Sequence, residues 1–313
     1  MRLGADRVLV KVPATSANLG PGFDALGIAL GIFDEVEVRL VAADTVEVEV
    51  RGEGAGQVPT GADHLIVRAL RHTLDAVGAP LAGLHLTCTN TIPHGRGLGS
   101  SAAAAVAGVL AGRALLADPA ALNAMDVLAL VTEFEGHPDN AAPAILGGGT
   151  IAWFDGSGKN DPRAARFEVD PRVTATVLIP DTHLATSTAR AVLPSEVPHA
   201  DAAFNVGRAS LLVHALTVAP ELLLVATEDR LHQPQRTAVM PGSAELLHTL
   251  RSAGFAATIS GAGPTVLVLT AAADATAALD AQLADLAPVL PGWRTVRPLI
   301  ETTGAQTHRI ASA

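Results

Sequence analysis

Residues 93–101 read Pro-His-Gly-Arg-Gly-Leu-Gly-Ser-Ser and run directly into the alanine-rich segment 102–116. Glycines let the backbone adopt positive φ and approach a ligand closely. The first turn of a helix offers unpaired N–H groups and the positive end of the helix dipole, and two serines at the junction add donors and can cap it. The alternative is an ordinary serine-capped loop, but three alternating glycines exceed what a cap needs. We therefore expect an anion site here, suited to the phosphates of a nucleotide.

Two other interpretations of this loop are excluded by its own residues. No Gly-x-x-x-x-Gly-Lys-Ser/Thr pattern occurs in the chain, so the loop is not a P-loop with a phosphate lysine. Ser100 and Ser101 lack the Gly-x-Ser-x-Gly elbow of an acyl-transfer nucleophile.

The composition limits the classes of protein that fit. The 313 residues carry a formal net charge of -10 with 3% aromatic residues, which argues against a nucleic-acid partner. Cys88 is the only cysteine, so an intrachain disulfide and a cysteine metal cluster are excluded. The most apolar stretch, 102–116, is too short to span a bilayer and contains Arg113. We expect a cytoplasmic protein without a leader or a membrane segment.

Hydrophobic periodicity predicts a mixed order of strands and helices. Expected strands cover 8–13, 36–40, 46–50, 84–89, 150–154, 173–179, 256–260, 266–270 and 293–299, with a further apolar run at 26–32. Expected helices cover 65–77, with Asp63 as its cap, 100–116, 123–134, 141–146, 187–193, 201–218, 220–231, 243–253 and 274–286. Because no regular βαβ repeat appears, we expect an α+β fold. A surface loop at 155–165 suggests domains at 1–165 and 166–313.

Four polar segments rich in glycine or proline interrupt this pattern, at 13–24, 93–101, 133–140 and 260–265. Each one lies between apolar elements, which is typical of loops that carry function on a rigid scaffold. One such segment would mean little, but four of them suggest a single shared site. We expect 13–24 to form a long loop.

The polar side chains of these segments allow several roles. Asn18 and Asp24 could bind a polar small molecule or form an Asx turn. Together with His137, the carboxylates of Glu133, Glu135 and Asp139 could form an acid–base or metal site, and carboxylates suit Mg²⁺; the alternative is a solvated helix end.

A third set consists of Thr186, Arg190 and Arg236. Arginine binds carboxylates in bidentate fashion, but any one arginine is more often part of a surface salt bridge. His64, His94 and the other histidines show no ligand spacing, which favours structural or surface positions.

The motifs together resemble a known family. Pro-Ala-Thr-Ser-Ala-Asn-Leu-Gly-Pro-Gly-Phe-Asp (13–24), Gly-Leu-Gly-Ser-Ser-Ala-Ala (97–103) and Ser-Gly-Ala-Gly-Pro-Thr (260–265) resemble the three motifs of the GHMP kinases. The first motif and Glu-Gly-His-Pro-Asp-Asn-Ala-Ala-Pro-Ala-Ile-Leu-Gly-Gly (135–148) are similar to the homoserine kinase family within them. The resemblance covers essentially the whole chain.

The resemblance implies a fold and an activity. The fold would combine an N-terminal domain like ribosomal protein S5 domain 2 with a ferredoxin-like C-terminal domain, and the active site would lie between them. The activity would transfer the γ-phosphate of ATP to the side-chain hydroxyl of L-homoserine, giving O-phospho-L-homoserine for threonine biosynthesis. A homodimer is also implied.

The same resemblance assigns roles to residues. The nucleotide phosphates would contact Pro93, His94, Gly95, Arg96, Gly97, Leu98, Gly99, Ser100, Ser101, Ala102 and Ala103. The homoserine pocket would be formed by Asn18, Asp24, His137, Asn140, Arg190 and Arg236. Mg²⁺ would be held by Ser100 with Glu133 or Glu135; Glu133 is preferred because the family glutamate precedes the helix break. Ser100, Asp139 and Thr186 would serve catalysis.

The chemistry of homoserine agrees with these positions. Its carboxylate suits paired arginines, and its ammonium group suits Asp24. Our hypothesis is that Asp139 orients the pocket and is not an essential base. One departure concerns the base of the nucleotide, because His64 stands where the family often has an asparagine that touches adenine.

Two alternatives stay open at this level. One is another GHMP kinase, acting on mevalonate or a sugar; those substrates lack the ammonium group that Asp24 suits. The other is a nucleotide-binding regulator without catalysis, in which damaged motifs would be expected, whereas the motifs here are intact.

Overall fold

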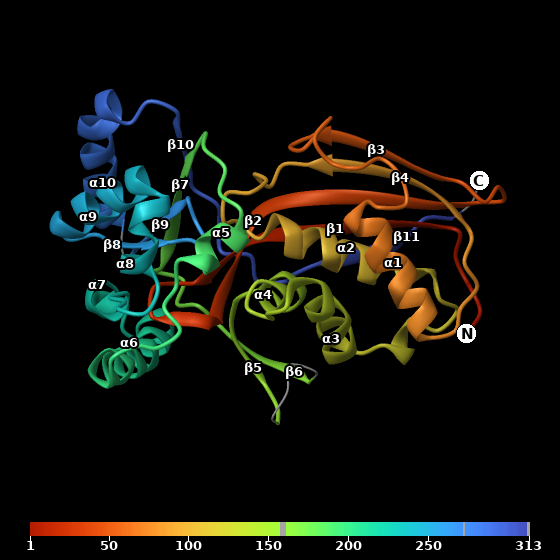
Figure 1. Ribbon diagram of the computed structural model, residues 1–313, viewed down its shortest axis with the longest axis horizontal. Helices are drawn as coiled ribbons and strands as arrows, with labels where there is room; N and C mark the ends of the chain where they lie inside the picture. The colour runs from red at the N-terminus through yellow and green to blue at the C-terminus, as the bar shows by residue number, and fades with distance from the viewer. Residues whose placement is uncertain (157–160, 272, 312–313) are drawn as a thin grey trace.

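Two β-sheets organise the computed structural model, which describes residues 1–156, 161–271 and 273–311 (Figure 1). Within these residues the first sheet has the order β11-β1-β2-β4-β3, with β5 joined to β2 and β6 joined to β5. Its strands are β1 (Arg7–Asn18), β2 (Gly22–Val41), β3 (Val46–Gly52), β4 (Gly83–Asn90), β5 (Gly149–Phe154), β6 (Pro162–Phe167) and β11 (Gln306–Arg309). The helices packed with it are α1 (Leu65–Ala76), α2 (Ser100–Leu115), α3 (Ala124–Glu135) and α4 (Ala141–Leu146).

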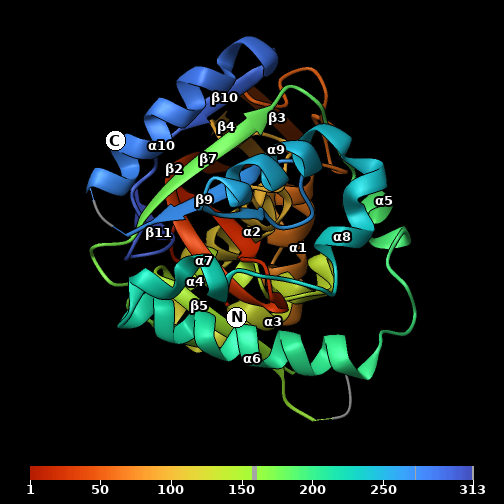
Figure 2. The ribbon, with the colours of Figure 1, turned by 90° about the vertical axis from the view of Figure 1, so that its left-hand side faces the viewer.

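The second sheet has the order β10-β7-β9-β8 and lies on the left in Figure 1. Its strands are β7 (Thr174–Pro180), β8 (Ala256–Ile259), β9 (Val266–Thr270) and β10 (Trp293–Val296). Around it lie α5 (Thr186–Ala191), α6 (His199–Thr217), α7 (Leu223–Ala226), α8 (Gln233–Arg236), α9 (Pro241–Ser252) and α10 (Ala273–Leu286). In Figure 2, where this half faces the viewer, α10 lies above the strands and α6 below them. The α+β prediction is confirmed.

The expected loop at 13–24 is mostly strand. β1 continues through Asn18, and β2 begins at Gly22, so only a tight turn separates them. The small residues Ala14 and Ala17 are fully buried, and their register against Leu30 and Gly27 of β2 shows why: they pack inside the sheet instead of facing solvent. Pro13, the first of the two prolines in this segment, lies at a shift in register, where a missing N–H is tolerated.

Two strands, β6 and β11, were not predicted from the sequence. β6 crosses the expected boundary at 165, and β11 pairs antiparallel with β1, so the chain returns to the first sheet at its end. Both strands are short and lack an apolar alternation: β11 is polar throughout, and in β6 two arginines flank a pair of alanines. Residues 157–160 of the expected surface loop lie outside the described residues.

Three helix ends also differ from expectation. The His64 side chain, and not Asp63, accepts the capping hydrogen bond of α1 from the N–H of Ile66. The N-cap of α2 is Gly99, and no serine side chain caps this end. The helix expected at 220–231 is only a 3-10 turn (Pro220–Leu222) followed by α7, because the chain turns after Ala226 toward Asp229, whose side chain is buried.

Close contact between α1 and α2 supports the loop that precedes α2. Most of α2 is buried, and the buried residues are mainly alanine and glycine. Gly108 faces α1 so closely that a Cβ atom there would lie 2.4 Å from the carbonyl oxygen of Ile66. The small side chains of α2 therefore set the distance between the two helices. Among the described residues, no helix is long and apolar enough to cross a membrane.

Changing Gly108 to alanine should destabilise the protein by about 1–3 kcal/mol, because the added methyl group overpacks the α1–α2 contact. Gly207 in α6 is the control, since a Cβ there would meet nothing within 4 Å. Gly207→Ala should stabilise by about 0.5–1 kcal/mol through helix propensity. Urea unfolding of both variants measures this; equal effects of the two changes would contradict the packing account.

Candidate active site

A cavity of about 270 Å³ lies where the sequence motifs meet. Its walls come from the end of β1, the loop before α2, the α3–α4 junction, α5 and α8. It is lined by Asn18, Pro93, Gly95, Arg96, Gly97, Gly99, Ser100, Ser101, Ala102, Phe134, Glu135, His137, Asp139, Asn140, Leu184, Thr186, Arg190, Arg236, Gly261 and Ala262. Residues from all four polar segments therefore line one cavity, as expected.

The loop before α2 is shaped by glycines. Gly99 has φ 71°, and a Cβ there would lie 2.0 Å from the Thr15 hydroxyl. At Gly97 a Cβ would lie 2.3 Å from the carbonyl oxygen of Ser260. Neither position can hold another residue without moving backbone or neighbours. The first turn of α2 faces the cavity. No side chain caps this end, so the positive end of the helix dipole is available to an anion.

Not every residue of this loop faces the cavity. The side chain of Leu98 is fully buried in the core and lines neither this cavity nor its neighbour, so only its backbone could contact a phosphate. The Arg96 guanidinium donates to the carbonyl oxygens of Pro180 (2.8 Å) and Asp181 (3.1 Å). Arg96 therefore fastens the loop to the end of β7. His94 and Ala103 line the neighbouring cavity instead.

The two candidate metal carboxylates lie on different faces of α3. Glu135 lines the cavity, and its Oε1 accepts a 2.5 Å hydrogen bond from Ser101. Burial raises the pKa of Glu135, and the Ser101 hydrogen bond offsets this only in part. Glu133 lies outside the cavity and pairs with His72 at 2.9 Å. The geometry therefore favours Glu135 over the preferred Glu133 for a metal at this cavity, because two positions along a helix differ by roughly 200° in direction.

Asp139 is the centre of a buried polar group. It is 2% exposed, and its Oδ1 lies 2.5 Å from His137 Nδ1 and 3.4 Å from Asn140 Nδ2. Burial alone would lower the pKa of His137, but the hydrogen bond and charge of Asp139 outweigh it, so the pKa is raised. Asn140 in turn accepts from Thr15 at 2.8 Å, which ties the α3–α4 junction to β1.

Asp24 and Arg190 bind each other. Arg190 Nη2 and Nη1 donate to the two oxygens of Asp24 at 2.6 and 3.1 Å. Asp24 does not line the cavity, whereas Arg190 does. The two groups that we expected to bind the carboxylate and the ammonium group of the substrate are therefore paired with each other in this structure. Thr186, at the start of α5, lines the cavity as expected.

Arg236 differs from the other arginines of the site. It is 1% exposed, and it donates to the carbonyl oxygens of Ala189 (3.1 Å) and Gly261 (3.1 Å). No carboxylate of the described residues lies within ion-pairing distance of it. Burial lowers its pKa, and the charge of Arg190 lowers it further. A buried cation without an ion-pair partner, at the wall of a cavity, is suited to an anionic ligand.

A second cavity of about 320 Å³ adjoins the first through Gly95, Ser100 and Ser101, which line both. Asp34, His64 and Asn90 contribute polar groups to it. Asp34 accepts from the N–H groups of Thr91 (2.7 Å) and Ile92 (2.9 Å), and burial, its largest influence, raises its pKa to about 6. The sequence analysis missed Asp34 and Asn90, since each lies in a strand whose alternation looks ordinary.

Comparisons with known proteins match this geometry. The GHMP kinases N terminal domain matches residues 64–148, and the GHMP kinases C terminal domain matches 208–285. A homoserine kinase of Leifsonia xyli subsp. xyli is 47% identical, covering 99% of this chain and 94% of its own. A homoserine kinase of Streptomyces coelicolor is 48% identical, covering 99% and 97%. The chain belongs to the homoserine kinase family of the GHMP kinases.

The similarity extends to a solved structure of this family. The crystal structure of homoserine kinase from Cytophaga hutchinsonii is 27% identical to this chain, with a TM-score of 0.83, and covers 97% of this chain and 98% of its own. The predicted GHMP kinase fold is thereby confirmed. The likeness spans both halves of the chain.

Proposed function

We propose that the protein transfers the γ-phosphate of ATP to the side-chain hydroxyl of L-homoserine, giving O-phospho-L-homoserine for threonine biosynthesis. The observation that carries this proposal is the buried guanidinium of Arg236, which lacks an ion pair in the described residues and faces the same cavity as the start of α2. One end of the cavity thus suits the carboxylate of an amino acid, and the other suits phosphate. Family membership supports the same reaction.

The phosphate end relies on the backbone and not on a lysine. The glycines of the loop allow close approach, and the uncapped first turn of α2 supplies N–H groups and a partial positive charge. Phosphoryl transfer needs positioning and charge neutralisation more than covalent help. The adjoining cavity, with Asp34, His64 and Asn90, has the position and size to receive the base of the nucleotide.

A magnesium ion fits the residues beside the phosphates. Glu135 offers a carboxylate and Ser100 a hydroxyl at the cavity wall, and hard oxygen ligands are what Mg²⁺ takes. Within the described residues no group of three or more His, Cys, Asp or Glu side chains could hold a metal by itself, so nucleotide oxygens would complete the coordination. When bound, the ion would neutralise charge on the phosphates.

At the amino-acid end, the substrate would lie between positively and negatively charged side chains. Its carboxylate would meet Arg236 and Arg190, and its ammonium group would meet Asp24, whose pairing with Arg190 must then be shared. Asn18, His137 and Asn140 complete the polar wall. Asp24 pairs with Arg190 and does not itself line the cavity, so a zwitterion would have to replace this pair, its carboxylate binding Arg190 and its ammonium group binding Asp24.

The hydroxyl of the substrate would lie between Asp139 and the phosphate loop. Both hydrogen bonds at Asp139 Oδ1 come from its neighbours His137 and Asn140, so this carboxylate is held in one orientation. We infer that Asp139 orients the pocket and is not an essential base, and that Thr186 contacts the transferred phosphoryl group. A homodimer and a cytoplasmic location stay predictions.

The substrate itself can be tested with a coupled assay that follows ADP release. With ATP and Mg²⁺, the purified chain should turn over L-homoserine and show no substrate-dependent ADP release with mevalonate or galactose, because those compounds lack the ammonium group. Turnover with a non-amino-acid alone would overturn the proposal.

The two glutamates of α3 form a matched pair for testing the metal site. Glu135→Gln should lower kcat by at least about 100-fold, comparable to loss of a charge-stabilising group in a transition state. Glu133→Gln, which removes only the exposed pair with His72, should keep kcat within about twofold. Steady-state kinetics across a Mg²⁺ titration measure both. The reverse pattern would return the metal role to Glu133.

The role of Asp139 is decided by a substitution that keeps its shape. Asp139→Asn should lower kcat by no more than about 100-fold and should raise the KM for L-homoserine, because it disturbs the orientation of His137 and Asn140. A loss of several orders of magnitude with unchanged affinity for homoserine would mean that Asp139 is the general base.

A further inference from the structure

His232 holds Arg236 through a hydrogen bond whose direction is fixed. Arg236 Nη1 lies 3.0 Å from His232 Nδ1. A guanidinium nitrogen can only donate, so Nδ1 must be the unprotonated acceptor of the ring. This contact is one of three that position the guanidinium, together with the carbonyl oxygens of Ala189 and Gly261.

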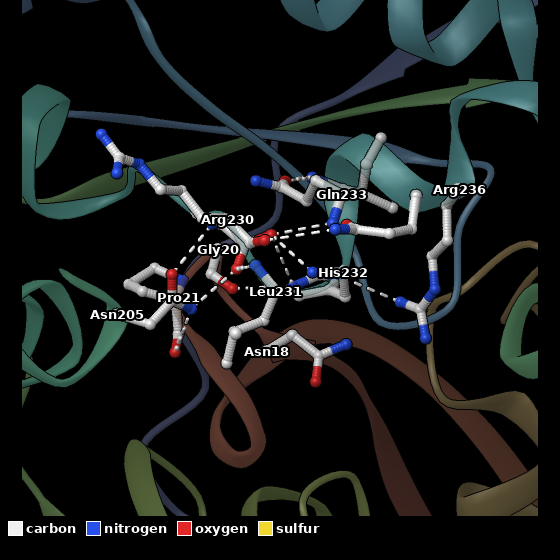
Figure 3. Close-up of polar contacts among 12 residues, drawn as sticks. Asn18, Gly20, Pro21, Asn205, Arg230, Leu231, His232, Gln233 and Arg236 are labelled. Carbon is white, nitrogen blue, oxygen red and sulfur yellow. Dashed lines mark hydrogen bonds and ion pairs between the residues drawn. The ribbon is translucent and has the colours of Figure 1, made fainter. Parts of the chain in front are cut away.

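The other ring nitrogen faces the opposite requirement. His232 Nε2 lies 2.7 Å from the carbonyl oxygen of Gly20, which can only accept, so Nε2 must carry the proton. The ring is therefore the neutral tautomer protonated on Nε2. Burial, the largest influence, lowers the pKa of His232, which agrees with a neutral ring. Figure 3 shows the ring lying between Gly20 and Arg236.

The segment that accepts from Nε2 belongs to the substrate site. Gly20 follows Asn18 and Leu19, which adopt positive φ of 69° and 51°, a costly conformation for residues with side chains. Asn18 lines the cavity, and its Nδ2 donates to the same Gly261 oxygen that accepts from Arg236. His232 and Gly261 thus connect the β1–β2 turn to Arg236 at two points.

The ring is itself firmly held. Asp229 accepts from the backbone N–H groups of Leu231 (3.0 Å), His232 (3.1 Å) and Gln233 (2.8 Å), which fixes the turn into α8. Phe23 stacks on the ring at a centroid distance of 5.1 Å. His232 itself is fully buried. A side chain this constrained has little freedom to adopt another tautomer or rotamer.

We propose that His232 is a positioning residue for the amino-acid substrate: its neutral ring, protonated on Nε2, holds the Arg236 guanidinium and the Asn18–Gly20 turn in one fixed relation. Arg236 is thereby aimed into the cavity while its charge stays unpaired. The proposal rests on the proposed contact between Arg236 and the substrate carboxylate. His232 does not line the cavity, so it acts through Arg236 and not on the reacting atoms.

Two substitutions separate the functions of the two ring nitrogens. In His232→Gln, the amide nitrogen replaces Nε2 and can donate to Gly20, but no acceptor faces Arg236. In His232→Asn, the amide oxygen replaces Nδ1 and can accept from Arg236, but the link to Gly20 is lost. The Gln variant should raise the KM for L-homoserine by about 10- to 100-fold, as expected for loss of a hydrogen bond to a charged group. The Asn variant should raise it by less than about threefold, within the range of a weak neutral bond.

The KM for ATP discriminates positioning from general damage. It should stay within about twofold in both variants, because the phosphate loop does not contact His232. A His232→Gln variant with an unchanged KM for homoserine would overturn the proposal. So would a His232→Gln variant in which the KM for ATP and the KM for homoserine rise equally. Arg236→Lys tests the underlying assignment: an unchanged KM for homoserine there would refute the carboxylate contact. A raised KM in Arg236→Lys with an unaffected Gln variant would refute only the role of His232.

The wild-type protein provides a test that does not depend on the variants folding. The protein would be labelled with ¹⁵N at its histidines, and the His232 signals would be assigned by their loss in His232→Asn or in another variant at this position. In ¹⁵N NMR near neutral pH, Nε2 of His232 should be protonated and Nδ1 unprotonated. A charged ring, or a proton on Nδ1, would overturn the proposal.

Discussion

The hydroxyl group of Ser260 joins three segments that lie far apart in the chain. It donates to the carbonyl oxygen of Gly97 at 2.6 Å and lies 2.8 Å from the Ser16 hydroxyl. Next to it, the N–H of Gly261 donates to the carbonyl oxygen of Ala17 at 3.0 Å. These contacts bring the end of β1, the phosphate loop and the β8–β9 turn together. The cavity exists because small residues let three backbones meet there.

From this junction the site acquires two ends of different chemistry. Toward α2, the glycine loop and the uncapped helix start form a neutral, backbone-built end that suits phosphate. Toward α8, Gly261 shares its carbonyl oxygen between Asn18 and Arg236, which forms a cationic end. The β8–β9 turn thus contributes to both ends, since Ser260 contacts the phosphate loop and Gly261 accepts from Arg236.

The sequence predicted the composition of this site better than its pairings. Motif residues identified the loop, the α3–α4 junction and the arginines, because glycine and carboxylate patterns report local chemistry. They could not decide between Glu133 and Glu135, whose types are identical and whose difference is the helix face. Nor could they show that Asp24 binds Arg190, since these residues are 166 positions apart. β11 was missed because its pairing with β1, and not its own polar pattern, makes it a strand.

The orientation of the substrate is the central claim, and the bond formed in the product tests it most directly. A ¹H–³¹P correlation spectrum of the product from ATP and L-homoserine should couple the new phosphorus to the methylene protons of the hydroxyl-bearing carbon, because in the proposed orientation the carboxylate would face Arg236 and the hydroxyl the phosphate loop. An acyl phosphate on the carboxylate, or release of inorganic phosphate alone, would contradict this account.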